Sequence, residues 1–190
     1  MRVTGGRYAG RQLIVPKGPR IRPTQDQVRQ ALFNILGDRV EGARVLDLFS
    51  GSGALGIEAL SRGAAHVTFV DRSGFSIRAI EANLRALVRT AGGGQVSLIR
   101  ADAVTTIQKL AKQEAIFDLI FMDPPYSLDL ARKTLMELSR CAIVSKVGWV
   151  VAEHNKRDPL PENLEGNNAR LATQRVEIYG DTALTFYQRQ

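Results

Sequence analysis

The chain has 190 residues, with 26 Lys or Arg against 19 Asp or Glu, and a formal net charge of +7. This length suits one domain with a short appendage, and such a domain buries a core without covalent staples. One cysteine and two histidines exclude a disulfide framework and a four-cysteine zinc site, so we expect no bound metal. No apolar leader and no run of 18 apolar residues is present, so we expect a cytoplasmic protein outside the membrane.

The excess positive charge lies almost entirely in the first 25 residues. That segment has six basic residues and no acidic one, which leaves 20 basic and 19 acidic residues in the rest of the chain. The six are Arg2, Arg7, Arg11, Lys17, Arg20 and Arg22. A basic segment on a near-neutral domain is typical of a polyanion partner, with phosphates as the obvious ligand. A solvated arm that aids solubility has the same composition, so charge alone favours nucleic acid only slightly.

The first 43 residues predict a basic arm followed by a helix. Residues 2–3 and 12–15 have the pattern of two short strands in a hairpin-like arm, and a proline-rich loop follows. Thr24 begins the predicted helix, because Gln27 three positions later completes a capping box and apolar residues recur at helical spacing. Gly37 is a suitable end for this helix. We assign residues 1–43 to this basic arm and helix, the part of the chain expected to face a nucleic acid.

The remainder, residues 44–190, predicts one α/β domain. Short apolar runs alternate with amphipathic helices; the predicted strands are 45–49, 66–70, 96–100, 117–122 and 147–153, and the predicted helices are 54–62, 73–88, 103–112 and 128–139. This alternation is typical of a parallel sheet covered by helices on both faces. Two final apolar runs flank Gly180 and Asp181, which predicts a β-hairpin and an antiparallel last strand. The total is a seven-stranded, mostly parallel sheet.

A glycine-rich segment joins the first strand of this domain to its first helix. Gly51, Gly53 and Gly56 match G-x-G-x-x-G, and Asp71 ends the next strand 20 residues after Gly51. A carboxylate at that spacing is where a ribose-binding acid is expected in nucleotide-binding folds. The glycines alone would also fit a tight strand-to-helix turn without any ligand. Together with Asp71 they favour a cofactor that contains a nucleoside.

Asp47 bears on the kind of cofactor. It lies four residues before Gly51, at the carboxyl end of the predicted strand. A carboxylate there would repel a pyrophosphate, whereas it would attract a cationic group. The ammonium of the amino acid part of S-adenosylmethionine is such a group.

A second motif, Asp123-Pro124-Pro125-Tyr126, follows the strand predicted at 117–122. Ligands of open parallel sheets bind beyond the carboxyl ends of the strands. The two prolines fix the backbone and leave carbonyl oxygens as acceptors, and Tyr126 offers an aromatic face. A carboxylate, a rigid carbonyl and a ring suit the exocyclic amino group of a nucleobase. The alternative is a proline-rich loop in which Asp123 caps a helix.

The two motifs together resemble the S-adenosylmethionine-dependent amino-methyltransferases of the Rossmann-like class. The opening block Arg2-Val3-Thr4-Gly5-Gly6-Arg7-Tyr8-Ala9-Gly10-Arg11, with Arg22-Pro23-Thr24-x-Asp26-x-Val28-Arg29-x-Ala31-Leu32-Phe33-Asn34, resembles the RsmD family of small-subunit rRNA guanine-N2 methyltransferases. This resemblance covers nearly the whole chain. It implies a class I methyltransferase fold, S-adenosyl-L-methionine as cofactor, and methylation of guanine N2 in 16S rRNA, either naked or in the assembled small subunit.

The resemblance also implies three groups of site residues. Those around the cofactor are Asp47, Phe49, Ser50, Gly51, Ser52, Gly53, Asp71, Asp102 and Ala103. Asp71 would bind the ribose hydroxyls, and Asp102 the adenine amino group with Ala103 against the ring. The implied catalytic residues are Asp123, Pro124, Pro125 and Tyr126, and the implied RNA contacts are Arg7, Arg11, Arg22, Thr24, Arg29 and Asn34. Asp102 could also cap the helix that follows it, and Arg22 and Arg29 could be solvated charges beside a helix.

Other functions remain open at this point. An adenine-N6 or cytosine-N4 methyltransferase acting on DNA or another RNA shares the Asp-Pro-Pro-Tyr motif, but such enzymes usually carry a separate target-recognition region. An NAD(P)-dependent oxidoreductase fits the glycine pattern. A basic RNA-binding module without activity is a third alternative, against which the intact acids Asp47, Asp71 and Asp123 argue. We expect a monomer.

Overall fold

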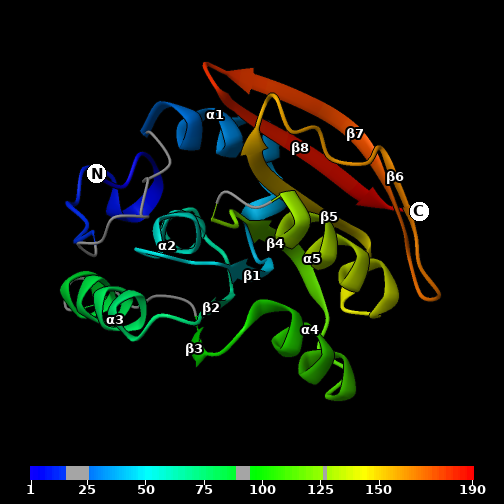
Figure 1. The fold of residues 1–190 in the computed structure, drawn as a ribbon. Coiled ribbons are helices and arrows are strands. Elements are labelled where there is room, and N and C mark those ends of the chain that lie inside the picture. Colours follow the sequence, from blue (N-terminus) through cyan, green and yellow to red (C-terminus); the bar gives the residue numbers. More distant parts are fainter. Residues whose placement is uncertain (16–25, 89–94, 126–127) are drawn as a thin grey trace. The chain divides into compact units, whose positions relative to one another are not determined.

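The computed structural model describes residues 1–15, 26–88, 95–125 and 128–190, and their packing divides into two compact units, residues 1–101 and 102–190. Figure 1 colours the first unit from blue to green and the second from green to red. The first unit contains the 3-10 turns η1 (Gly6–Tyr8) and η2 (Gly37–Val40), the helices α1 (Asp26–Leu36), α2 (Ala54–Ser61) and α3 (Gly74–Val88), and the strands β1 (Arg44–Leu48), β2 (His66–Asp71) and β3 (Gln95–Arg100).

Within the first unit, three parallel strands lie in the order β3-β2-β1. Val45, Leu46 and Leu48 are wholly buried, as expected for a central strand covered on both faces. The register pairs Leu48 with Val70 on β2, so the carboxyl ends of these strands meet at one edge. The glycine-rich loop after β1 and the acid that ends β2 therefore stand side by side.

The N-terminal arm packs into this first unit. Val3 donates its N–H to the Arg11 carbonyl at 2.9 Å, and Arg2 and Gln12 form an isolated antiparallel bridge. The arm therefore doubles back as predicted, but its two halves meet at this single bridge rather than as the strands predicted at residues 2–3 and 12–15. Val3, Tyr8 and Leu13 are buried, so the arm contributes apolar side chains to the core. The functional division at residue 43 stays a prediction, because the arm and the glycine-rich loop share one compact unit.

The second unit contains α4 (Ala103–Lys112), β4 (Phe117–Met122), α5 (Leu128–Arg140), β5 (Val144–Asn155), β6 (Asn163–Glu165), β7 (Arg170–Tyr179) and β8 (Thr182–Arg189). β4 and β5 are parallel, and β8 runs antiparallel to β5. β7 pairs antiparallel with β8 around a turn at Gly180, where φ is 61°, and the long hairpin is plain in Figure 1. β6 pairs antiparallel with β7 at the end of the order β4-β5-β8-β7-β6.

The predicted α/β class, with parallel strands followed by an antiparallel last strand, is confirmed. The described residues contain eight strands rather than seven, because the three-residue strand β6 adds to the predicted set. Only its central residue, Leu164, is buried, so β6 carries no alternating pattern that a sequence could reveal. In the described part of the chain, no helix combines the length and the apolar character needed to cross a membrane.

Candidate functional site

The loop after β1 has an unusual backbone. Gly51 and Gly53 have φ of 54° and 77°, and Phe49, which carries a side chain, has φ of 61°. A non-glycine residue in this left-handed region costs about 1–3 kcal/mol, and such residues cluster at ligand clamps. The surrounding structure therefore holds this loop in a defined shape rather than letting it relax.

Ser50 and Asp71 hold that shape by binding the backbone. The Ser50 hydroxyl lies 2.6 Å from the Asp47 carbonyl oxygen and accepts the Val70 N–H at 2.9 Å. The Asp71 carboxylate accepts the N–H of Gly51 at 2.9 Å. The Ser50 side chain is thus engaged in hydrogen bonds that hold the loop. The predicted contact of Ser50 with a cofactor would therefore come from its backbone. Asp71 lies beside the glycine-rich loop, as the sequence predicted.

Asp47 is a buried carboxylate under the loop. Only 2% of the residue is exposed, and its Oδ2 accepts the N–H of Gly56 on α2 at 2.9 Å. Burial is the main cause that raises the pKa of Asp47 to about 7; the negative charge of Asp71 contributes to the rise, and the hydrogen bond from the Gly56 N–H opposes it. A cation beside Asp47 would lower this pKa again, because it would stabilise the charged form.

The three glycines of the motif differ in what surrounds them. A Cβ on Gly56 would overlap the ring of Phe69, and a Cβ on Gly53 would lie 2.9 Å from Cγ1 of Ile80. A Cβ on Gly51 would meet nothing closer than a backbone oxygen at 3.9 Å. Gly53 and Gly56 therefore allow close packing within the protein. Gly51 borders open space, where a ligand can approach the backbone.

Asp102 and Ala103 follow β3 at the start of α4. Asp102 is exposed, and its Oδ1 accepts the Thr105 N–H at 3.1 Å, so the helix-capping alternative is confirmed. Ala103 is buried. The N–H and the hydroxyl of Thr105 both donate to Oδ1, so Oδ2 keeps acceptor capacity, and the contact of Asp102 with a base stays a prediction.

Asp123 and Pro124 follow the last residue of β4 directly. Asp123 is half-buried, Pro124 is buried and Pro125 is exposed. The motif therefore lies at the carboxyl end of a buried parallel strand, as predicted. Tyr126 lies outside the described residues.

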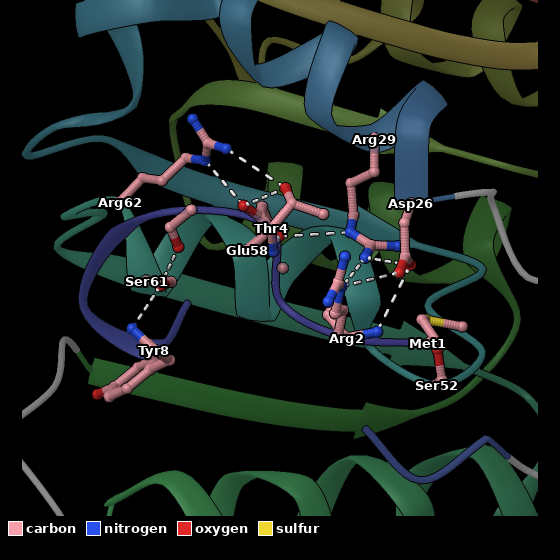
Figure 2. A network of polar contacts seen from close by, with 12 residues as sticks. Met1, Arg2, Thr4, Tyr8, Asp26, Arg29, Ser52, Glu58, Ser61 and Arg62 are labelled. Carbon is pink, nitrogen blue, oxygen red and sulfur yellow. Dashed lines mark hydrogen bonds and ion pairs between the residues drawn. The ribbon is translucent and has the colours of Figure 1, made fainter. Parts of the chain in front are cut away.

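The arm is joined to α1 and α2 by a polar network around Glu58 (Figure 2). The Glu58 carboxylate is fully buried and accepts both the N–H and the hydroxyl of Thr4, each at 2.8 Å. It also forms ion pairs with Arg29 at 3.4 Å and Arg62 at 2.9 Å. Two guanidinium groups and two neutral donors thus compensate one carboxylate in the interior.

The burial of Arg29 corrects the sequence prediction. Its side chain is 0% exposed, so it is neither an RNA contact nor a solvated charge beside a helix. It pairs with Asp26 at 2.9 Å as well as with Glu58, and it donates to the carbonyl of Arg2. Arg29 is buried because two carboxylates and a backbone oxygen satisfy its charge and donors there.

The other predicted RNA contacts divide into two groups. Arg7 and Arg11 are exposed on the arm, and Asn34 is exposed on α1. Arg22 and Thr24 lie outside the described residues. The described part of the basic segment thus keeps two of its predicted cations on the surface.

Three features of the structure were not predicted from the sequence. Glu58 is the one charged residue of the apolar helix α2, which was a usable signal for a buried pair. Asn83 lies buried inside α3, where Asn is an unfavourable helix residue. Phe75 is 68% exposed with the guanidinium of Arg78 4.7 Å from its ring centroid, and an aromatic between arginines is a signal for nucleic-acid contact.

A family model and two named relatives match this chain over nearly its full length. The model of the family described as conserved hypothetical protein 95 matches residues 1–188. A Bacillus subtilis protein, YlbH, provisionally named an rRNA methyltransferase, is 38% identical over 190 residues, which is 100% of both chains. An Escherichia coli protein named ribosomal RNA small subunit methyltransferase D is 33% identical over 190 residues, covering 100% of this chain and 90% of its own.

A solved structure shows the same architecture. Escherichia coli yhhF, provisionally named a methyltransferase, is 30% identical and superposes with a TM-score of 0.81 over 100% of this chain and 98% of its own. In the residues that the structure describes, no group of three His, Cys, Asp or Glu could hold a metal ion.

Proposed function

Because the chain belongs to the RsmD family, whose model is described as conserved hypothetical protein 95, we propose that it methylates the exocyclic N2 of a guanine in small-subunit rRNA, with S-adenosyl-L-methionine as cofactor. The observation that carries this proposal is the buried Asp47 carboxylate below the open backbone at Gly51, with Asp71 at the same loop. The Escherichia coli relative's name supports small-subunit rRNA as the substrate.

The glycine-rich loop suits a cationic cofactor better than a dinucleotide. A pyrophosphate beside Asp47 and Asp71 would meet two carboxylates, whereas an ammonium there gains a charged partner. Asp71 keeps spare lone pairs for ribose hydroxyls, and Asp102 with Ala103 would hold the adenine. When bound, S-adenosylmethionine supplies an activated methyl group on its sulfonium. These residues fix its orientation, and the loop carries no side chain at Gly51 that would obstruct it.

We expect cofactor affinity to depend on the protonation of Asp47. Below pH 7 a proton competes with the ammonium for this carboxylate, because its pKa is raised to about 7. The dissociation constant should therefore rise by roughly tenfold for each pH unit below 7 and change little above it. Calorimetric titration with S-adenosylhomocysteine from pH 5.5 to 8.5 measures this, and Asp47→Asn should bind weakly with a flat profile. If the dissociation constant varied with pH equally in the wild type and in Asp47→Asn, the proposed contact between Asp47 and the ammonium group would be wrong.

The same shift predicts an unusual stability profile for the protein without cofactor. Because the pKa of Asp47 is raised in the folded state, its contribution to the free energy of unfolding is fully present below pH 4. That contribution is lost as the pH rises to about 7. The loss amounts to at most about 4 kcal/mol. Asp47→Asn should therefore be more stable than the wild type at pH 8, and the difference should shrink toward pH 4. Urea unfolding of both proteins across this range measures the difference.

Gly51 and Gly56 give a matched pair of substitutions. Gly51→Ala should cost about 1–2 kcal/mol of stability from its left-handed backbone, yet weaken cofactor binding by more than tenfold, because its methyl group enters the open space. Gly56→Ala should destabilise by about 1–3 kcal/mol or more, because it overpacks the contact with Phe69. Thermal unfolding and calorimetric titration separate the two effects. If the Gly51→Ala protein kept the wild-type affinity for the cofactor, the proposal that the cofactor binds at this loop would be wrong.

For the substrate, Asp123 and the Pro124 carbonyl would each accept one N–H of the guanine amino group. These two acceptors would turn the nitrogen lone pair toward the methyl donor and stabilise the positive charge that grows on nitrogen. Alignment within about 3–3.5 Å of the reacting carbon would supply much of the rate enhancement. Tyr126 would stack on the base, which must be splayed out of its surroundings.

The basic arm would bind the RNA backbone. Arg7 and Arg11 are exposed cations there, and Arg22, Thr24 and Asn34 extend the proposed contact. Phosphate contacts of this kind position RNA without reading its sequence, and their affinity falls as salt rises. We therefore propose that folded RNA or the assembled small subunit supplies part of the specificity.

The test supplies radiolabelled S-adenosylmethionine with three substrates: small ribosomal subunits that lack their own modification, naked small-subunit rRNA, and duplex DNA. We expect label in the rRNA of the particle or of the naked transcript. Label in DNA alone would support the alternative of an amino-methyltransferase for adenine or cytosine in DNA. Absence of label from both RNA substrates, with cofactor binding intact, would contradict the proposed substrate.

A further inference from the structure

Asn83 on α3 binds the N-terminal arm through its backbone. The residue is 2% exposed, and its Oδ1 accepts the Ile14 N–H at 2.7 Å. Its Nδ2 donates to the Ile14 carbonyl at 2.9 Å. One amide side chain therefore satisfies both backbone groups of Ile14, in the manner of a neighbouring strand.

The same amide reaches the glycine-rich loop. Nδ2 of Asn83 also donates to the carbonyl of Ser52, at 3.0 Å. Ser52 lies between Gly51 and Gly53, both in the left-handed region, so its carbonyl sets the direction of the backbone at the proposed cofactor contact. A single buried side chain thus joins the end of the basic arm to the loop proposed to hold the cofactor.

The beginning of the arm makes a second contact with this loop. The Ser52 hydroxyl lies 3.7 Å from the sulfur of Met1, and Leu13 donates its N–H to the Met1 carbonyl at 3.1 Å. One half of the arm therefore contacts Ser52 directly through Met1, and the other half reaches Ser52 through Asn83. Displacing the arm would remove the Met1 contact from Ser52, and it would leave the Asn83 amide, which also binds Ser52, without its two hydrogen bonds to Ile14.

The contact at Ile14 depends on hydrogen bonds more than on apolar packing. The Ile14 residue is 56% exposed, so its side chain gains little from burial. At Ile14 itself the contact consists of the two hydrogen bonds to the Asn83 amide, whereas the buried side chains of Val3 and Leu13 hold the rest of the arm. A change at Asn83 should therefore alter the docking of the arm end without emptying the core.

We propose that Asn83 is a positioning residue that couples the basic arm to the cofactor loop, so that RNA on the arm and cofactor on the loop strengthen each other's binding. This inference rests on the proposed function. In this proposal the arm end has a docked state, in which the Asn83 amide binds Ile14 and Ser52 together, and an undocked state, in which the amide loses Ile14 and holds Ser52 less firmly. Each ligand favours the docked state, so each raises the affinity for the other by the same factor.

The test measures the dissociation constant of labelled S-adenosylhomocysteine by equilibrium dialysis, with and without excess small ribosomal subunits. The variant is Asn83→Ala, and Ile14→Pro breaks the same contact from the arm side by removing the N–H. Ile14→Ala is the matched control, because it trims an exposed side chain and keeps the backbone that Asn83 binds. Filter binding of the subunits with and without S-adenosylhomocysteine gives the reciprocal factor.

We expect subunits to tighten S-adenosylhomocysteine binding to the wild type by about 5- to 150-fold, the usual range of such coupling. Asn83→Ala and Ile14→Pro should bind it at least tenfold more weakly and lose the coupling, while Ile14→Ala should match the wild type. A variant that binds more weakly but keeps the full coupling factor would show a merely structural role and overturn the inference. If the wild-type protein binds both ligands but shows no coupling between them, only this inference is overturned. If it binds neither S-adenosylhomocysteine nor the subunits, the proposed function is overturned as well.

Discussion

Replacing Asp123 with Ala is expected to lower the single-turnover rate of methyl transfer by about 10²–10³-fold. The physical reason is that the carboxylate accepts an N–H of the reacting amine and stabilises charge that exists only in the transition state. Cofactor affinity should stay within about twofold, since Asp123 is not among the proposed cofactor contacts. Labelled transfer to small subunits, with calorimetric titration of S-adenosylhomocysteine, measures both quantities.

The control for this substitution is Asp129→Ala. Asp129 is an exposed acid in the first turn of α5, in the same unit and close in sequence, and it has no proposed role. It should transfer methyl groups at the wild-type rate. If Asp123→Ala also kept the wild-type rate, the amine would not depend on this carboxylate, and the proposed role of Asp123 would be wrong.

Replacing Glu58 with Ala is expected to destabilise the protein by about 3–5 kcal/mol, because it removes the one fully buried carboxylate that pairs with the buried Arg29 and leaves only Asp26 as its charged partner. The midpoint of thermal unfolding should fall by roughly 10 °C, as expected for a chain of this size. Thr4 loses two hydrogen bonds in the same change, so the arm should also become sensitive to proteolysis. Calorimetry and limited proteolysis measure the two effects.

Two comparisons sharpen this expectation. Glu58→Gln keeps a carbonyl acceptor for Thr4 but removes the charge, so its loss of stability should be smaller than that of Glu58→Ala. Glu41→Ala removes an exposed acid of the same unit and should change stability by less than about 0.5 kcal/mol. A loss below about 1 kcal/mol for Glu58→Ala would mean that the network of Figure 2 does not hold the arm.

Features encoded by neighbouring residues could be predicted from the sequence. The apolar run at β4 predicted its bounds, Phe117–Met122, because a strand buried on both faces has a continuous apolar pattern. The loop at Gly51 and the acid Asp71 follow from a spacing that strand, turn and helix impose together. Asp123 could be placed at the end of β4 for the same local reason.

Features that depend on distant residues could not be predicted. The burial of Arg29 depends on Glu58, 29 positions away, and no local pattern distinguishes it from a solvated helix charge. The pair of Asn83 and Ile14 joins positions 69 apart through backbone atoms, which carry no sequence signature. The raised pKa of Asp47 arises mainly from its burial in the folded first unit, so its preference for a cationic ligand could be predicted from the sequence but its pKa could not.

The most direct test of the central claim is the identity of the methylated nucleoside. Small-subunit rRNA labelled by this protein would be digested, and the labelled nucleoside would be separated by chromatography and identified by mass spectrometry. The Asp123→Ala protein serves as the negative control. We predict N2-methylguanosine as the labelled product of the wild type and its loss in the variant. Labelled N6-methyladenosine or N4-methylcytidine would keep the cofactor and the amino-methyl transfer but contradict guanine N2 as the target.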